Sequence, residues 1–342
     1  MSKQTAFFST LSLVVVAQAA QAQTCAPPSL ADKVELKPVA GTNLMTVPVA
    51  INGTAKQMLL DVGSNPDEIS QAAIGDLHLV PIDQRTAANT AATINPQLQF
   101  LPAVVDVRGT NGMPLPQVRA DSFTMGGNTL ANMRFLVSND RDLGKSKPYD
   151  GRLTAAGFQK YDMDMDFGGK QLSFMAATAC ADPNQIARWP HAALAVIPMT
   201  MTGGKMTVPV SIGGHQIDAV IDTGSDKTVM RRGAAERVFG LKADSDMTQV
   251  DGMRDGAGER VYQHTFPEIT FEGVVARNVP ALIQSNSMVR PARSTASTGS
   301  RLSATPIVGT PIPDLTLGMD VLSQLHIYAA FGQGKLYVTP AS

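Results

Sequence analysis

The sequence predicts an all-β protein built from two similar halves. A block of strand and turn sequence occurs twice, with an offset of 161 residues. Polar and apolar residues alternate over short segments, and Gly, Asn and Pro residues separate these segments. With 342 residues the chain is long enough for two compact domains that each bury a core.

The repeat extends over three blocks that keep the same order along the chain. The matching pairs are residues 45–64 with 206–225, 123–132 with 269–278, and 167–172 with 331–336. The first pair begins with MTVPV in both copies and ends with DVGS in one and DTGS in the other. Chance similarity between β-rich segments is a poor explanation for three blocks in register.

Each copy of the first block reads as a hairpin. Residues 46–51 and 207–212 carry the alternation of a strand, and Asn52-Gly53 and Gly213-Gly214 are typical two-residue turns. The predicted organisation is a leader at residues 1–22, an N-terminal arm at 23–42, a first lobe at 43–176, a linker at 177–198 and a second lobe at 199–342.

The N-terminus has the pattern of an export signal. Lys3 supplies the positive end, residues 6–17 the apolar region, and Ala20-Gln21-Ala22 a small-x-small cleavage site. We therefore expect cleavage after Ala22 and an exported protein, periplasmic or secreted. A buried N-terminal helix is the structural alternative.

Export would expose the chain to oxidising conditions, in which disulfides persist. The chain after Ala22 has two cysteines, Cys25 and Cys180, so the simplest expectation is one bond that ties the N-terminal arm to the linker. A lipid anchor on Cys25 is the alternative, although the residues before it lack the usual pattern.

Charge and composition exclude several functions. The formal net charge is −1, without clustered basic residues, which argues against nucleic acid as a partner. The longest apolar run is too short for a membrane span. Residues 162–166 alternate Asp and Met, but Gly168 comes one place late for a calcium loop, so we interpret them as a strand with one wet face and expect no metal or cofactor.

The two Asp turns carry the chemistry. In each, apolar strand residues are followed by Asp, a small or hydroxyl residue, Gly and Ser, which makes a tight turn that projects one carboxylate. Two similar halves related by an approximate two-fold axis would bring Asp61 and Asp222 face to face at the interface between the lobes. Clefts tend to form at such interfaces.

These motifs resemble those of the aspartic peptidases. VIDTGS at residues 220–225 is similar to the catalytic turn of that family, and LTLGMDVL at 315–322 is similar to its second signature, which supports the turn from below. The resemblance implies two retropepsin-like β-barrel lobes in a pepsin-like bilobal arrangement. It also implies an endopeptidase without cofactor, active as a monomer on an extended polypeptide in the inter-lobe cleft.

The resemblance assigns roles to particular residues. Asp61 and Asp222 would be catalytic, one as base and one as acid, because two close carboxylates share a proton. Gly63, Gly224 and Thr223 would support the turns. Ser64 and Ser225 would donate to the outer carboxylate oxygens or, alternatively, make local turn bonds. Flap hairpins are expected around Gly109, Asn111 and Gly112 in lobe 1 and Asp255 and Gly256 in lobe 2, with ordinary surface hairpins as the alternative.

Lobe 1 departs from the family pattern at three positions. Val62 replaces a hydroxyl residue that would bond to the opposite lobe, Arg152 takes an expected apolar place, and Thr154 replaces a Gly. These departures leave two further readings open. The chain could be a catalytically weak or inactive relative that binds peptides or a partner protein, or it could form its dyad from two copies of lobe 2 in a homodimer.

Overall fold

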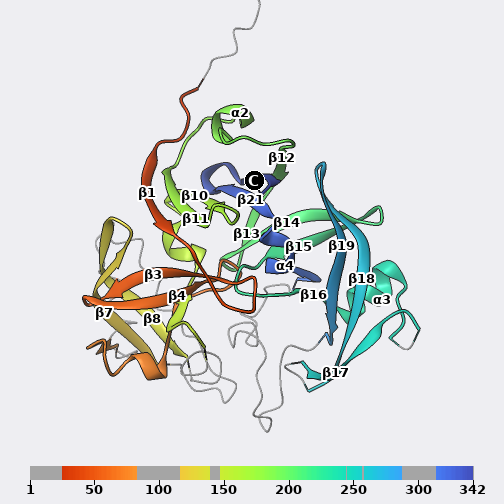
Figure 1. Cartoon of the computed structure of the whole chain (residues 1–342), viewed down its shortest axis with the longest axis horizontal. Coiled ribbons are helices and arrows are strands. Elements are labelled where there is room, and N and C mark those ends of the chain that lie inside the picture. Colours follow the sequence, from red (N-terminus) through yellow and green to blue (C-terminus); the bar gives the residue numbers. More distant parts are fainter. Residues whose placement is uncertain are drawn as a thin grey trace, which may run out of the picture.

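The computed structural model describes residues 25–82, 116–138, 147–243, 245–255, 258–286 and 313–341, so the predicted leader lies outside the described residues. Strands dominate these segments, and the predicted all-β class is confirmed. Figure 1 shows two lobes side by side and a third group of strands that joins them. No helix in the described segments is long and apolar enough to cross a membrane.

Lobe 1 is an eight-stranded sheet that closes on itself. A pairing between β3 and β7 joins the ends of six of its strands into a barrel. In spatial order the strands are β2 (Lys37–Pro38), β3 (Met45–Ile51), β4 (Thr54–Leu60), β9 (Gly151–Leu153), β5 (Glu68–Ser70), β8 (Asn128–Ser138), β7 (Gln117–Met125) and β6 (Val80–Pro81).

Lobe 2 has a sheet with the same order of corresponding strands, closed by the equivalent pairing of β14 with β18. In spatial order these are β13 (Thr200–Thr202), β14 (Lys205–Ile212), β15 (His215–Ile221), β20 (Leu315–Leu317), β16 (Thr228–Arg231), β19 (Val274–Gln284), β18 (Arg260–Phe271) and β17 (Thr248–Arg254). The short helices are η1 (Gln71–Ala73), η3 (Ala155–Phe158), α2 (Pro183–Ile186), α3 (Arg232–Phe239), α4 (Met319–Leu322) and η5 (Phe331–Gln333).

The predicted hairpins form as expected. Asn52 and Gly53 have φ of 48° and 81°, and Gly213 and Gly214 have φ of 55° and 82°, which is the left-handed pair that a tight two-residue turn requires. Along β14, buried and half-buried residues alternate strictly. The alternation places one side of each hairpin in the barrel core.

A six-stranded sheet holds the lobes together. The N-terminal arm contributes β1 (Leu30–Glu35), and lobe 1 contributes β11 (Gln171–Ala176) and β10 (Tyr161–Asp166). Lobe 2 contributes β21 (Leu325–Ala330) and β22 (Lys335–Pro340), and the linker contributes β12 (Ala195–Pro198). β10 and β21 pair antiparallel at its centre. The expected arm and linker are therefore partly strands. The arm supplies β1 and the linker supplies β12 at the two edges of this sheet, and pairing with the neighbouring strand satisfies their backbone hydrogen-bonding groups.

The polar face of β10 is covered, which corrects the expectation of a wet face. Asp162 is 1% exposed, accepts a hydrogen bond from the Tyr328 hydroxyl at 3.1 Å, and has its pKa raised by burial. His326 Nε2 lies 2.6 Å from Asp164 Oδ1, and the Trp189 ring stacks on His326 with centroids 3.9 Å apart. The linker thus packs over the polar side of the shared sheet.

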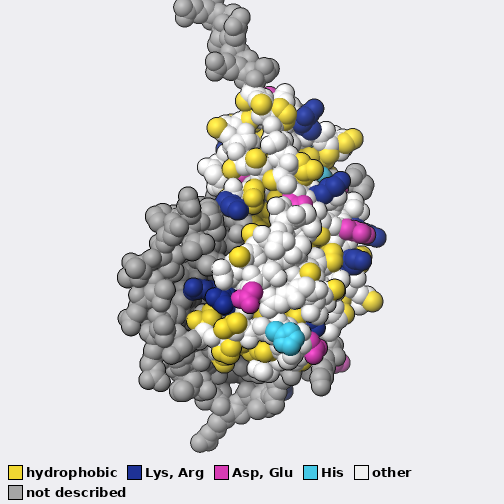
Figure 2. All heavy atoms as spheres, turned by 90° about the vertical axis from the view of Figure 1, so that its left-hand side faces the viewer, with side chains coloured by type: hydrophobic (Ala, Val, Ile, Leu, Met, Phe, Trp, Pro, Cys, Tyr) yellow, Lys and Arg dark blue, Asp and Glu magenta, His cyan; other side chains and the backbone are white. Residues whose placement is uncertain are grey.

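The surface that faces the viewer in Figure 2 is the lobe 1 side of the molecule. Over its coloured area, Lys and Arg side chains are interspersed with Asp and Glu and with apolar groups. Among the described residues, no group of three or more His, Cys, Asp or Glu side chains could hold a metal ion.

The predicted disulfide is present between Cys25 and Cys180, which are 155 residues apart in sequence. Cys180 is buried, and Gln333 donates from Nε2 to its carbonyl oxygen at 2.7 Å. The bond therefore fixes the start of the described chain to the segment that follows β11.

We expect the double variant Cys25→Ser/Cys180→Ser to have a free energy of unfolding about 2–4 kcal/mol lower than the wild type, because a long loop in the unfolded chain is no longer closed. Urea denaturation measures this difference. The wild type under reducing conditions serves as the control and should lose the same amount. Mass spectrometry of the non-reduced protein should find the linked peptides, and two free thiols would contradict the assignment.

Candidate active site

The two Asp turns have equivalent supports. Asp61 follows β4 and its backbone N–H donates to the carbonyl of Leu153 in β9 at 2.9 Å. Asp222 follows β15 and donates in the same way to Leu317 in β20 at 3.0 Å. Both supporting strands run parallel to the strand that ends in the Asp. Each carboxylate is therefore held at the end of a strand whose neighbour fixes the turn.

The turns meet at their glycines. A Cβ at Gly63 would lie 2.6 Å from Oδ1 of Asp222, and a Cβ at Gly224 would lie 2.6 Å from Oδ1 of Asp61. Real Cβ atoms do not approach other atoms so closely, so any larger residue at either position would displace the opposite carboxylate. The structure thus brings together Asp61 and Asp222, as the two-fold argument predicts, and explains why glycine is needed in both turns.

Thr223 ties the two turns across the lobes. Its hydroxyl donates to the Leu60 carbonyl at 2.8 Å and accepts from the Val62 N–H at 3.0 Å. Thr223 is 1% exposed and Val62 is fully buried. Because Val62 has no hydroxyl, its side chain cannot make the reciprocal pair of bonds, and the brace runs from lobe 2 to lobe 1 only.

Asp61 is buried, and its carboxylate receives its partners on one oxygen. Ser64 Oγ donates to Oδ2 at 2.8 Å, and Arg152 Nε lies 3.5 Å from the same oxygen. Oδ1 is buried and has no hydrogen-bond partner among the described residues. One oxygen is therefore held by the protein and the other is available for a bound molecule.

The Asp222 carboxylate has a different environment. The Gly224 N–H donates to its Oδ1 at 3.0 Å. Burial and the nearby charge of Asp61 raise the pKa of Asp222 to about 7, while the charge of Lys205 acts in the opposite direction. Ser225 does not match Ser64, because its hydroxyl donates to the Lys227 carbonyl at 2.7 Å. Ser64 therefore bonds its carboxylate, and Ser225 makes the local turn bond that was the alternative.

Arg152 is buried with a second acid, Glu68. Its Nη1 lies 3.1 Å from Glu68 Oε2, and the two side chains are 9% and 3% exposed. At the equivalent register lobe 2 has Thr316 paired with Val229. The apolar place expected at Arg152 thus holds a guanidinium that is compensated by carboxylates on two sides.

Asp67 supports the turn that follows β9. Its Oδ1 accepts from the Thr154 N–H at 2.6 Å, and burial, together with the charges of Glu68 and Asp61, raises the pKa of Asp67 to about 7. Lobe 2 makes this support with Thr228, whose hydroxyl accepts from the Gly318 N–H at 3.2 Å and donates to Asp320 at 2.7 Å.

Sequence reasoning missed Asp67, Glu68 and Lys205 as neighbours of the site. The repeat held a usable signal for two of them, because the offset of 161 residues aligns Asp67 and Glu68 with the uncharged Thr228 and Val229. Charged residues at positions that are uncharged in the sister lobe indicate a local difference in chemistry.

The flap candidates are mostly outside the described residues, as Gly109, Asn111, Gly112 and Gly256 are not described. Asp255 is described and lies between β17 and β18. It is 4% exposed, and its carboxylate accepts from the N–H groups of Glu259 and Ser285, both at 2.9 Å. Its side chain therefore holds the hairpin together at this end.

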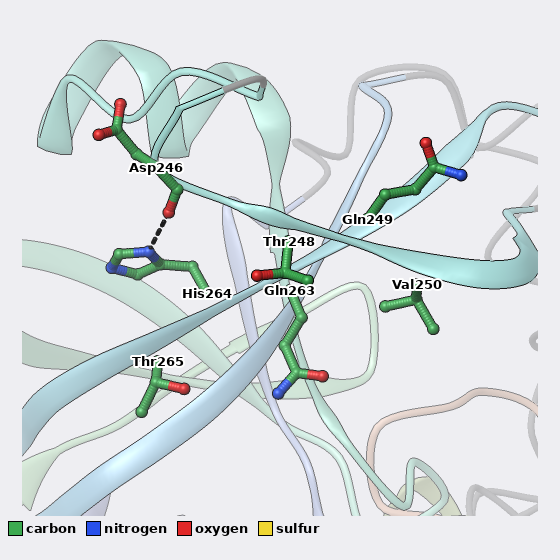
Figure 3. A pocket seen from close by; sticks show the side chains of 7 residues that line it. All are labelled: Asp246, Thr248, Gln249, Val250, Gln263, His264 and Thr265. Atoms are coloured by element: carbon green, nitrogen blue, oxygen red, sulfur yellow. Dashed lines mark hydrogen bonds between the residues drawn. The ribbon is translucent and has the colours of Figure 1, made fainter.

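A cavity of about 420 Å³ on lobe 2 is lined by residues of the paired strands β17 and β18 and by Asp246 (Figure 3). Its lining is mostly polar, and His264 Nδ1 lies 2.8 Å from the Asp246 carbonyl. The lining residues are Asp246, Thr248, Gln249, Val250, Gln263, His264 and Thr265. Neither Asp61 nor Asp222 belongs to this cavity, so it has no part in the arrangement described above.

Comparison with known proteins gives one family match. Residues 208–321 match the family model described as aspartyl protease. This segment contains the Asp222 turn and its supporting strand β20. A search of curated proteins found no match.

Three solved structures are similar to the chain at low sequence identity. Basic 7S globulin from soybean has 13% identity and a TM-score of 0.44, and covers 92% of this chain and 95% of its own. Conglutin gamma from lupine seeds has 12% identity and a TM-score of 0.47, with 91% and 95% covered. A retropepsin-like aspartic protease from Rickettsia conorii has 11% identity and a TM-score of 0.29, and covers 44% of this chain and 96% of its own.

We predict that Thr223→Val lowers the free energy of unfolding by about 1–3 kcal/mol, because the buried Leu60 carbonyl and Val62 N–H both lose their partner. Thr223→Ser keeps the hydroxyl and should stay close to the wild type. The reciprocal change Val62→Thr should stabilise by about 0.5–1.5 kcal/mol if its hydroxyl makes the missing bonds. Equal stability of the Val and Ser variants in urea unfolding would contradict the role given to Thr223.

A second prediction concerns pH and Asp67. The folded chain holds a proton on Asp67 at pH values at which the unfolded chain has lost it, since the pKa rises from 3.8 to about 7 on folding. Stability should therefore fall as the pH rises from about 4 to about 7, by up to about 1.4 kcal/mol per pH unit for this group. Asp67→Asn, which keeps an acceptor for Thr154, should flatten this decrease in urea unfolding.

Asp121→Asn is the control, because Asp121 is exposed and pairs only with Arg119 on the surface among its described contacts. An identical pH dependence in the Asp67 and Asp121 variants would show that Asp67 is already ionised in the fold.

Proposed function

We propose that the chain, whose residues 208–321 match the aspartyl protease family model, is an exported endopeptidase that hydrolyses peptide bonds with Asp61 and Asp222. The observation that carries the proposal is the contact of each carboxylate with the glycine of the opposite turn. Two neighbouring carboxyl groups that cannot both ionise hold one proton between them, as in aspartic proteases.

The proposed chemistry is general acid–base catalysis on water. An ionised carboxylate takes a proton from a bound water, which attacks the carbonyl carbon of the peptide, and the protonated carboxyl hydrogen-bonds the carbonyl oxygen. The free Oδ1 of Asp61 supports this proposal, because a buried carboxylate oxygen without a partner favours a hydrogen-bond donor such as water. The substrate would be an extended polypeptide.

The disulfide between Cys25 and Cys180 supports export, since such bonds persist in oxidising compartments. Together with the leader pattern at residues 1–22, it favours a periplasmic or secreted protein.

A second candidate function is peptide or partner binding without efficient cleavage. Two observations favour it: Val62 leaves the cross-lobe brace one-sided, and Arg152 lies 3.5 Å from Asp61. A guanidinium so close to the carboxylate could hold it back from proton transfer. Cleavage by the wild type decides between the two candidates.

We expect Asp61→Asn and Asp222→Asn each to lower peptide cleavage by at least about 10²-fold, which is the usual contribution of a general acid or base. Cleavage of an unfolded, fluorescently labelled protein measures this loss. Asp218→Asn, an exposed change in the same strand as Asp222, is the matched control and should keep full activity. An inactive wild type would support the binding function, and loss in Asp222→Asn alone would support a homodimer of lobe 2.

The pH profile gives an independent check. Because the pKa of Asp222 is raised to about 7, the pair keeps its single proton below that pH and loses it above. Activity should therefore fall as the pH rises through about 7. Activity that increases steadily beyond pH 8 or so would contradict a protonated Asp222.

A further inference from the structure

A chain of buried charges in lobe 1 leads to the site. Arg152 lies between two acids, with Nε 3.5 Å from Asp61 Oδ2 and Nη1 3.1 Å from Glu68 Oε2. The exposed fractions of these side chains are 9% for Arg152, 4% for Asp61 and 3% for Glu68. Removing three charged groups from water is unfavourable before their mutual attraction is counted.

The barrel itself does not require these charges. β9 pairs Arg152 with Glu68 in β5, and at the same register of lobe 2 β20 pairs Thr316 with Val229 in β16. The sister lobe thus builds the same strand pairing with uncharged residues. Of the two lobes as described, lobe 1 has this costly arrangement, and there Arg152 lies 3.5 Å from a carboxylate of the site.

The two site carboxylates therefore have different charged groups around them. Asp61 faces the Arg152 guanidinium and the Ser64 hydroxyl, both of which favour its ionised form. Asp222 accepts from one backbone N–H, that of Gly224, and lies near the negative charge of Asp61. The other charged or titratable groups near the pair are Asp67, Glu68, Tyr149 and Lys205.

We infer that Arg152 is a positioning residue that holds Asp61 as the ionised member of the pair and leaves the proton on Asp222. This inference rests on the proposed function and assigns its two roles. Glu68 complements Arg152 by compensating the guanidinium from the far side, so that Arg152 is not a lone buried cation.

The assignment gives a balanced reaction. Asp61 takes one proton from water as the water oxygen bonds to the carbonyl carbon, and Asp222 gives its proton to the carbonyl oxygen, which yields a neutral diol. The C–N bond then breaks as Asp61 passes its proton to the leaving nitrogen and Asp222 takes one back from a diol hydroxyl. Both carboxylates end in their starting states, with Asp61 next to Arg152 ionised again.

The test compares variants that remove, keep or replace the charge. Arg152→Gln removes it, and Arg152→Lys keeps it. Glu68→Val/Arg152→Thr copies the uncharged pair of lobe 2, so neither acid nor base is left buried alone. For each protein, kcat/KM for a peptide is measured across pH, and the protonation of the Asp carboxyl carbons is followed by NMR with ¹³C-labelled aspartate.

We expect the acid limb of the profile of kcat/KM against pH to move up by about one pH unit or more in Arg152→Gln and in the double variant. At a given pH on that limb, such a shift is a tenfold loss of kcat/KM. Arg152→Lys should keep the limb near its wild-type position. A role in folding alone would lower activity equally at all pH values. A limb that does not move in the double variant would therefore overturn the inference.

Higher activity in the double variant than in the wild type would also overturn it, because Arg152 would then restrain Asp61 instead of preparing it. The NMR titration separates this inference from the proposed function, since it needs no turnover. If the wild type cleaves nothing, the proposed function fails, yet the NMR signals of the Asp carboxyl carbons should still differ between the wild type and Arg152→Gln. Identical carboxyl signals in the wild type and Arg152→Gln would count against Arg152 whatever the activity.

Discussion

The close approach of two turns is the constraint on which the rest of the site depends. Gly63 lies against the Asp222 side chain, and Gly224 lies against the Asp61 side chain. Neither position has room for a Cβ. Such an approach is possible only if both turns are fixed from behind, and strands β9 and β20 do this through backbone hydrogen bonds to the two Asp residues. The Thr223 hydroxyl then fixes the turns to each other.

The two lobes support equivalent Asp turns with different side chains. Lobe 2 supports its turn with the Thr228 hydroxyl, which accepts from the Gly318 N–H and donates to Asp320. Lobe 1 uses Asp67, Glu68 and Arg152 at related positions and gives up the hydroxyl at Val62. A nearly symmetric backbone therefore surrounds its two carboxylates with unequal electrostatic environments.

Much of this arrangement could be read from the sequence because it depends on local patterns. The repeat, the Asn52-Gly53 and Gly213-Gly214 turns and the two Asp motifs each occupy a few consecutive residues, and so do their structural consequences. The contacts of Arg152 and Asp67 could not be read in this way, since they join residues about 85 positions apart and depend on which strands become neighbours. The polar cover of β10 was missed for the same reason, because Trp189 and His326 reach it from distant segments.

The shared six-stranded sheet has a consequence for how the chain folds. Its central pairing joins β10 to β21, so residues 163–166 must find residues 326–329, and β1 must find β11 across a similarly long separation. The barrels, by contrast, contain hairpins such as β3–β4 whose partners follow directly in sequence. Pairings of large sequence separation raise the contact order and slow folding, because a long loop is closed before any contact stabilises it. We therefore expect the hairpins to form first, the barrels next, and the sheet that unites them last.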